Sequence, residues 1–208
     1  MIENDAGFDG WEEYDLLTME TASALFVPAV ASLGELLPHD GLLSPEELEA
    51  IACGIVSQTE LWHPLAHTDT QHRRYELIYE DERMDAWVLS WMPGQGTGFH
   101  DHYISSVGLC GARGVVREDM LRYGAEDVTM DLGSGDSRCG GPGYIHRVTH
   151  SEGSPAVTIH VYSPRLDWVG QYRLAEDGSS AARCGPVATS SPSKLVAAGA
   201  LEHVLERF

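Results

Sequence analysis

Basic residues are scarce in this chain of 208 residues. Lys+Arg number 13 and Asp+Glu number 32, so the formal net charge is −19. An acidic surface repels phosphate backbones and anionic lipids, and we therefore expect no nucleic-acid partner and no membrane partner. No apolar run approaches the roughly 20 residues that span a bilayer. The acidic start, MIENDAGFDGWEEYD, does not resemble a secretory signal, which favours a cytoplasmic protein.

Cysteine is also rare. The four cysteines form no C-x-x-C pair, and their spacing matches no zinc framework. Because no export signal is recognised, we expect Cys53, Cys110, Cys139 and Cys184 to be free thiols in a reducing cytoplasm.

The first part of the chain has the pattern of helices. Ser44, Pro45 and Glu47 form an S-x-x-E capping box with proline at the first helical position. Apolar residues follow at helical spacing and predict a packing face. A second helix is expected near residues 21–31, so residues 1–70 are interpreted as a helical N-terminal extension packed on the domain that follows.

From about residue 74 the periodicity changes to short runs rich in β-branched and aromatic residues, separated by glycine-rich turns. This pattern predicts a mainly β fold, a barrel or jelly roll, over residues 71–175. Residues 176–208 are expected to form a C-terminal arm, a loop over 175–194 and then a short helix, within one structural domain. The strands are expected at residues 75–79, 85–92, 105–110, 113–119, 127–132, 144–149, 155–163 and 168–174.

Histidine, in contrast, is abundant, with ten residues. His100 and His102 are two positions apart, so on a strand their side chains point to the same face. Two imidazoles on one face can bind one metal ion, and a small barrel can bring His146, on another predicted strand, opposite them. The sequence therefore predicts a metal site formed by His100, His102 and His146.

The glycines around these histidines strengthen that prediction. The spacing Gly94-x5-His100-x-His102 resembles the first motif of the cupin family, a jelly-roll type β-barrel, and Gly143-x-x-His146 resembles the end of the second. These two motifs, in this order on a strand-rich chain, indicate a cupin barrel.

The first cupin motif usually includes a glutamate ligand shortly after its second histidine, but this chain has Ser106 and Val107 there. Asp101 is expected on the opposite face of the strand and does not replace it. Three neutral imidazoles leave the charge of a divalent ion uncompensated and several positions open. Such a site attracts anions and suits a redox metal that meets both a substrate and O₂.

A longer set of motifs resembles the thiol dioxygenases, cysteine dioxygenase and its relatives. In that family an arginine precedes a strand, and a Trp-x-x-Gly segment leads into His-Asp-His. The matching segments here are Arg74, WMPGQG (91–96), HDH (100–102), HRV (146–148) and AVTIHVYSP (156–164). The resemblance runs from about Arg74 to Tyr162 and covers most of the predicted barrel.

This resemblance implies a role for each matched residue. His100, His102 and His146 would bind Fe(II). Arg74 would bind the substrate carboxylate, because a guanidinium presents a planar fork of donors. Tyr162, His160 and Thr158 would form a catalytic relay beside the iron; they alternate along one strand and share a face.

The substrate-binding residues are ambiguous. Arg73 is adjacent to Arg74, and a shift of one residue exchanges them. His72 stands where the family often has tyrosine, two residues before the arginine, and we include it among the predicted substrate-binding residues. In the 3-mercaptopropionate branch of the family this position is often glutamine, so the resemblance favours a cysteine-like substrate.

The resemblance implies an Fe(II)-dependent dioxygenase that adds O₂ to a small thiol, cysteine or a related mercapto-carboxylate, and forms a sulfinate. The expected partners are a small-molecule thiol and O₂, in a monomer or small homo-oligomer. Two alternatives remain open at this point. One is a cupin dioxygenase or isomerase with a non-thiol substrate, and the other is a non-catalytic cupin that binds a metal or small ligand.

Overall fold

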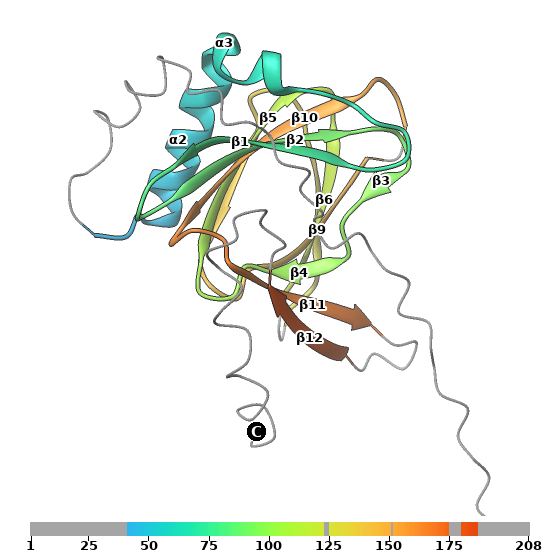
Figure 1. The fold of residues 1–208 in the computed structure, drawn as a ribbon. Coiled ribbons are helices and arrows are strands. Elements are labelled where there is room, and N and C mark those ends of the chain that lie inside the picture. The colour runs from blue at the N-terminus through green and yellow to red at the C-terminus, as the bar shows by residue number, and fades with distance from the viewer. Residues whose placement is uncertain (1–40, 123–124, 151, 175–179, 187–208) are drawn as a thin grey trace, which may run out of the picture.

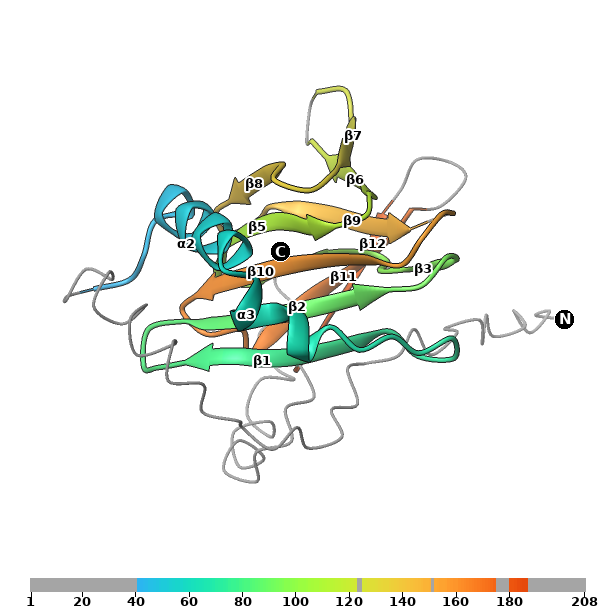
Figure 2. The same cartoon turned by 90° about the horizontal axis from the view of Figure 1, so that it is seen from above.

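The computed structural model describes residues 41–122, 125–150, 152–174 and 180–186. Over these residues the chain forms two antiparallel sheets that face each other (Figures 1 and 2). The first sheet has the order β1-β2-β10-β5-β8, with bounds Arg74–Glu80, Asp85–Trp91, Ala156–Ser163, Ser106–Arg113 and Ser137–Gly140. The second has the order β12-β11-β4-β9-β6-β7, with bounds Ser180–Pro186, Trp168–Leu174, Phe99–Asp101, Ile145–His150, Val116–Leu121 and Val128–Leu132.

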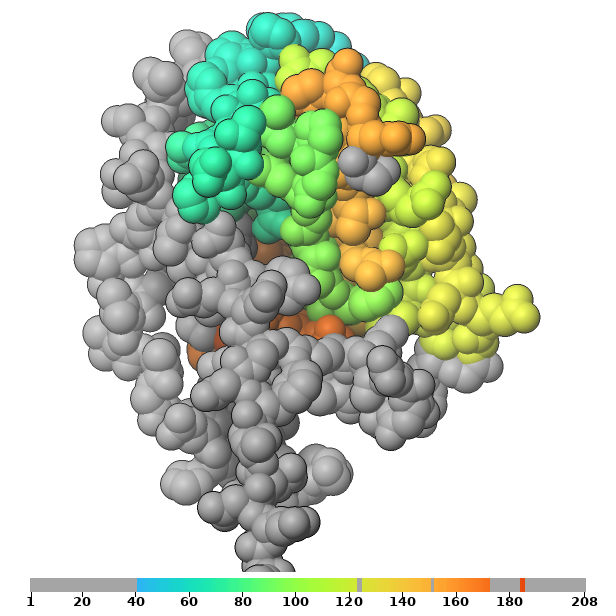
Figure 3. Space-filling view, turned by 90° about the vertical axis from the view of Figure 1, so that its right-hand side faces the viewer, coloured from blue at the N-terminus to red at the C-terminus, as the bar shows by residue number. Residues whose placement is uncertain are grey.

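A short strand, β3 (Gln95–Gly96), also pairs with β9, outside the main strand order of the second sheet. Figure 3 shows this face of the molecule, where the green segment that includes β3 adjoins the yellow and orange segments of β9 and β10. Side chain and backbone both hold the junction: the Val148 N–H donates to Thr97 Oγ1 at 2.9 Å, and the Thr97 N–H donates to the Val148 carbonyl at 2.8 Å.

Within the described part of the chain, three helical segments precede the barrel: α2 (Pro45–Ser57), α3 (Thr59–Trp62) and the 3-10 helix η1 (His63–Leu65). The predicted capping box of α2 is confirmed. The Glu47 N–H donates to Ser44 Oγ at 3.3 Å, and the Ser44 N–H donates to Glu47 Oε2 at 2.7 Å. The helix expected near residues 21–31 lies outside the described residues.

Helix α2 packs against the outer face of the first sheet, over β5 and β10 (Figure 2). The approach is very close at Gly108 of β5. A Cβ atom at this position would lie 2.2 Å from the backbone nitrogen of Glu49 and from the backbone carbonyl carbon of Leu48. Only glycine leaves room for the helix there, so this residue sets how closely α2 seats on the sheet.

The alternation of side chains along β5 and β10 separates two cores. Cys110 and Ile159 point outward and join the cluster beneath α2. Leu109 and Tyr162 point inward and join the cluster between the two sheets. All eight residues of β10 are buried, because this strand is covered on both faces. The inner face of β10 is therefore available for a site between the sheets.

The mainly β fold predicted from the sequence is confirmed, and each predicted strand has an observed counterpart. The sequence pattern missed the short strands β3, β4 and β8. The expectation of a loop over 175–194 is wrong for Ser180–Pro186, which forms β12. Residues of this segment are mostly small and carry little strand signal, but β11 offers an unpaired backbone edge whose polar groups they satisfy.

The helix expected after residue 194 lies outside the described residues. Among the residues that the structure describes, no helix is long and apolar enough to cross a membrane.

Candidate metal centre

Three histidines meet between the two sheets. One ligand nitrogen from each of His100, His102 and His146 lies within 4.8 Å of those of the other two. Their ring centroids are separated by 4.6 to 5.1 Å. His102 and His146 are buried and His100 is partly buried. The structure thus brings together the three residues that the sequence predicted as a metal site.

Strand pairing places two of these histidines face to face. His100 of β4 and His146 of β9 are direct antiparallel partners, so their side chains project from the same face of the second sheet. His102 follows the end of β4, where the chain turns sharply. Tyr103 has φ of 56°, in the left-handed region, and its N–H donates to Asp101 Oδ1 at 3.1 Å.

Asp101 lies on the opposite face from the two histidines, as predicted. Its Oδ1 accepts the Gly170 N–H at 3.0 Å, and its Oδ2 accepts the Tyr172 hydroxyl at 2.6 Å. These bonds join β4 to β11 and fix the short strand that carries His100. The aspartate of the His-Asp-His segment is therefore an anchor for the metal-facing side chains and is not one of them.

The environment keeps the imidazoles of His100 and His102 neutral. Burial, with a smaller contribution from His146, lowers the pKa of His100 to about 3. Burial and the neighbouring His146 also lower the pKa of His102 well below its ordinary value. Neutral imidazole is the form that ligates a metal, so these two residues are ready to bind one at neutral pH without first losing a proton.

The hydrogen bonds leave the metal-facing nitrogens without partners. His100 Nδ1 lies 3.0 Å from the Gly98 carbonyl and can only donate to it, which leaves Nε2 with a lone pair. Both ring nitrogens of His102 and Nε2 of His146 are buried with no hydrogen-bond partner among the described residues. Unpartnered buried nitrogens are costly, by about 1–3 kcal/mol each. A metal ion at the centre of the cluster would take one nitrogen from each of the three rings, so the residues fit one.

Glu118 is a site residue that the sequence interpretation missed. It is completely buried on β6, and its Oε1 lies 2.6 Å from His146 Nδ1 and accepts the Tyr144 hydroxyl at 2.9 Å. A carboxylate behind a histidine fixes its tautomer, with the proton on Nδ1 and the lone pair of Nε2 directed to the metal. The carboxylate ligand of the first cupin motif is absent here, but Glu118 supplies a carboxylate that acts on the site through His146.

We expect Glu118→Gln to weaken metal binding about 10- to 100-fold, because an amide holds the His146 tautomer less strongly than a carboxylate does. Titration of the metal-free protein with Fe(II) under anaerobic conditions measures this. Asp119→Asn, the adjacent residue, whose carboxylate bonds Arg147 and Thr129, is the matched control and should retain wild-type affinity. Equal affinity of Glu118→Gln and the wild type would contradict the role of Glu118.

A buried chain of hydrogen-bonded polar side chains runs along β10. Thr158 Oγ1 lies 3.0 Å from His160 Nε2, and His160 Nδ1 lies 3.2 Å from the Tyr162 hydroxyl. The Tyr162 ring is 5.0 Å from the ring of His102, centroid to centroid, so the chain ends beside the histidine cluster. Burial lowers the pKa of His160 and raises that of Tyr162, so both groups are neutral. The three residues predicted as a relay are hydrogen-bonded in sequence.

Arg73, and not the predicted Arg74, is the arginine that reaches this region. Its charge acts on His100, His160 and Tyr162, and its side chain donates to the Gly96 carbonyl at 3.1 Å. The Arg74 guanidinium instead pairs with Asp69 at 2.9 Å on the other side of the strand.

His72, the other predicted substrate-binding residue, is exposed, and its N–H donates to Asp69 Oδ1 at 3.2 Å. The structure does not bring Arg74 or His72 to the histidine cluster.

The alternation of side chains along β1 explains why Arg73, and not Arg74, reaches this region. Tyr75 and Leu77 pack against the inner cluster, so Arg73, two positions before Tyr75, shares their side of the strand. Arg74 shares its side with Glu76. The polar pair Arg74 and Glu76 against the apolar pair Tyr75 and Leu77 was the signal in the sequence that could have assigned the face.

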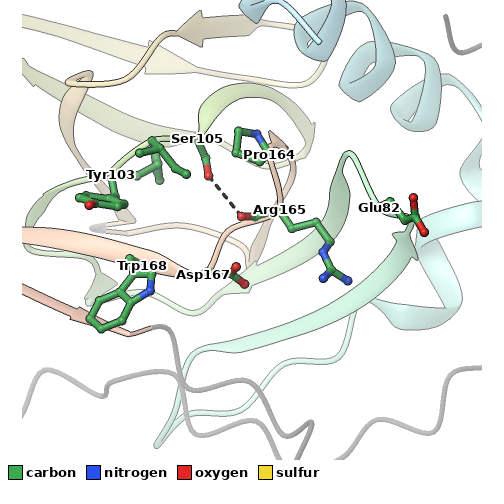
Figure 4. Close-up of a pocket in the computed structure, with 9 residues that line it drawn as sticks. Glu82, Tyr103, Ser105, Pro164, Arg165, Asp167 and Trp168 are labelled. Carbon is green, nitrogen blue, oxygen red and sulfur yellow. Dashed lines mark hydrogen bonds between the residues drawn. The ribbon is translucent and has the colours of Figure 1, made fainter. Parts of the chain in front are cut away.

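A pocket of about 310 Å³ opens beside His102. Its walls come from the loop between β4 and β5, the loop between β10 and β11 with the start of β11, and the turn between β1 and β2, with Tyr103, Asp167, Trp168 and Glu82 among its lining residues (Figure 4). Ser105 Oγ donates to the Arg165 carbonyl at 3.3 Å and joins the two loops. This volume is at the small end of the range for small-molecule sites.

A double-sheet barrel with three inward-facing histidines defines a cupin with a metal-binding centre. The sequence pattern of cysteine dioxygenase type I matches residues 17–174, about three quarters of the chain. The chain belongs to the cysteine dioxygenase type I family, whose fold is the cupin barrel described above.

Several solved structures are similar to part of the chain. A protein from Thermus thermophilus, TT1209, is 25% identical, with a TM-score of 0.44, over 50% of this chain and 93% of that one. A protein with a double-stranded β-helix domain from Klebsiella pneumoniae is 19% identical, with a TM-score of 0.44, over 49% and 80%. A cupin superfamily protein from Desulfitobacterium hafniense is 12% identical, with a TM-score of 0.43, over 50% and 87%. No curated protein matches the chain.

Proposed function

We propose that this protein is an Fe(II)-dependent thiol dioxygenase that converts cysteine or a related mercapto-carboxylate to its sulfinate. In the overall reaction RSH and O₂ give RSO₂⁻ and H⁺. Sulfur gains two S–O bonds and loses four electrons, and O₂ accepts those four electrons. The observation that carries the proposal is the buried Thr158-His160-Tyr162 chain that ends beside three metal-ready histidines.

His100, His102 and His146 would hold the iron, and His146 is oriented for this by Glu118. Fe(II) bound there would lower the pKa of the substrate thiol and supply the redox chemistry that O₂ needs. No general base is then required of the protein. Its own contribution is to orient the substrate, exclude water and direct hydrogen bonds at the reacting atoms.

Arg73 is the group best placed to bind the substrate carboxylate. Its guanidinium lies over the ring of Trp91, 5.0 Å from the centroid, and one N–H is bonded to Gly96, so its position is set before substrate binds. A planar guanidinium matches a carboxylate with two parallel hydrogen bonds. Because the carboxylate fixes the other end of a small molecule, the thiol would be directed to the histidine cluster.

Tyr162 would donate a hydrogen bond to the oxygen atoms that acquire negative charge during the reaction. Burial raises the pKa of Tyr162 above that of an ordinary phenol, so the hydroxyl keeps its proton throughout the pH range of an assay. The hydroxyl is held by His160 and needs no reorganisation as charge develops. A protein that only binds a metal has no need of such an oriented donor.

Oxygen uptake with a panel of thiols tests the proposal. Iron-loaded protein should consume O₂ and form sulfinate in equal amounts with cysteine or a mercapto-carboxylate, as measured with an oxygen electrode and mass spectrometry. Removal of the metal with a chelator should abolish both, and Fe(II) should restore them. Iron-loaded protein that consumes no O₂ with any thiol, or that turns over only a non-thiol substrate, would contradict the proposal.

A further inference from the structure

Trp91 stands at the far end of the buried chain on β10. Its indole N–H donates to Thr158 Oγ1 at 2.9 Å, and the side chain is completely buried at the end of β2. We infer that this single donor sets the direction of every hydrogen bond from Trp91 to Tyr162, so that the Tyr162 O–H points into the metal centre. Trp91 is then a positioning residue that acts through Thr158 and His160.

The direction follows from the donors and acceptors in order. An indole N–H can only donate, so Thr158 Oγ1 accepts it. The one other hydrogen-bond partner that the described residues give this hydroxyl is His160 Nε2, so the Thr158 proton goes to that nitrogen. His160 is neutral because burial lowers its pKa, and its single proton is therefore on Nδ1.

The Nδ1–H of His160 then donates to the oxygen of Tyr162. The phenolic proton cannot point back to His160, and it is left to donate towards the region beside His102. With the opposite tautomer of His160, the same atoms at the same distances would direct the phenolic proton away from the site. The tautomer therefore decides whether Tyr162 can donate to substrate or O₂.

The flat face of the Trp91 ring contacts Arg73, whose guanidinium carbon lies 5.0 Å from the ring centroid. One side chain thus supports two groups, the hydrogen-bond chain through its N–H and the arginine through its π-face. The two contacts are expected to affect different kinetic parameters. Loss of the N–H alone should lower kcat, whereas loss of the ring should also raise KM.

The tautomer can be measured without metal or substrate. In the metal-free protein labelled with ¹⁵N-histidine, long-range ¹H–¹⁵N correlation spectra distinguish a protonated Nδ1 from a protonated Nε2, and loss of a signal in His160→Gln assigns the ring. We expect the wild type to hold the proton on Nδ1. Trp91→Phe should lose this preference, as should Thr158→Val, while Thr158→Ser should keep it.

Trp87→Phe is the matched control. Trp87 lies on the same strand and packs in the same inner cluster, but its indole nitrogen has no hydrogen-bond partner among the described residues. The His160 tautomer should be unchanged in Trp87→Phe. We expect the two tryptophan variants to lose similar thermal stability. A change of tautomer in Trp91→Phe alone is then due to the missing N–H and not to the smaller ring.

The effect on catalysis rests on the proposed function. With iron and thiol, Trp91→Phe should lower kcat about 10- to 100-fold with little change in KM. Trp91→Leu should show the same fall in kcat and, in addition, a KM raised about 5-fold by the loss of the cation–π contact.

A wild-type His160 with its proton on Nε2, or a Trp91→Phe protein that keeps the wild-type tautomer, would overturn the inference. An absence of thiol oxidation with the expected tautomers would overturn the proposed function and leave the hydrogen-bond direction standing.

Discussion

Replacement of Tyr162 with phenylalanine should lower kcat about 10²- to 10³-fold, the usual effect of removing one oriented donor to a developing negative charge. Phenylalanine keeps the ring that packs 5.0 Å from His102, so the metal centre should keep its shape. The iron content of the purified variant should therefore equal that of the wild type. Oxygen uptake at saturating thiol measures the fall in kcat.

Tyr79→Phe is the matched control for this change. The Tyr79 hydroxyl also bonds a single side chain, Asp81 at 3.1 Å, but Tyr79 packs in the outer cluster beneath α2. Its loss should leave kcat unchanged. A Tyr162→Phe protein with wild-type kcat would remove the oriented donor from the mechanism, and one without iron would show that the hydroxyl supports the metal centre itself.

The second large effect is expected at Arg73. Arg73→Gln should raise KM for cysteine or a mercapto-carboxylate about 100-fold, because two charge-assisted hydrogen bonds to the carboxylate are lost. Arg74→Gln should change KM less than about 2-fold, since Arg74 lies on the other side of the strand and a partly exposed ion pair such as Arg74–Asp69 contributes little. The two neighbouring arginines serve as controls for each other.

A second substrate makes the test specific for the carboxylate. The wild type should prefer a carboxylated thiol over an aminothiol of the same length that lacks the carboxylate, and Arg73→Gln should remove most of that preference in kcat/KM. Equal KM changes for both substrates would instead assign Arg73 to the support of Trp91 and the barrel. A large effect in Arg74→Gln alone would restore the assignment made from the sequence.

The position of Arg73 also clarifies the role of the chain's net charge of −19. The excess of acid repels anions from the surface as a whole, but the barrel interior has a different balance. There, neutral histidines surround a place for a cation, and a guanidinium lies within electrostatic reach of it. Recognition of a small anionic thiol would thus depend on a few interior groups, and the global charge would act on solubility.

How far the sequence determines the site depends on the kind of residue. The three histidines were predictable because metal ligation demands specific side chains at specific spacings, and the His-x-His pair and the later His146 meet that demand. A period of two places Thr158, His160 and Tyr162 on one face of any strand, but their interpretation as a relay depended on the resemblance to the thiol dioxygenases.

Residues that act through a partner distant in the sequence were not predictable in the same way. Glu118 is 28 positions from the histidine that it orients, and the contact exists only because β6 pairs with β9. Trp91 meets Thr158 across 67 positions, where β2 and β10 lie side by side. Strand order decides these contacts, and strand order depends on which edges meet in the folded barrel.

The sequence by itself thus specified a mainly β barrel, its capped helix, the three candidate metal ligands and the polar face of β10, because these follow from local periodicity and from the chemistry of single side chains. The folded barrel placed Arg73, and not Arg74, on the inner side of the strand. It also placed Glu118 behind His146 and paired β12 with β11. The physical reason is that facing and pairing depend on contacts between strands far apart in the chain, and a change of one residue in register exchanges the inner and outer faces of a strand.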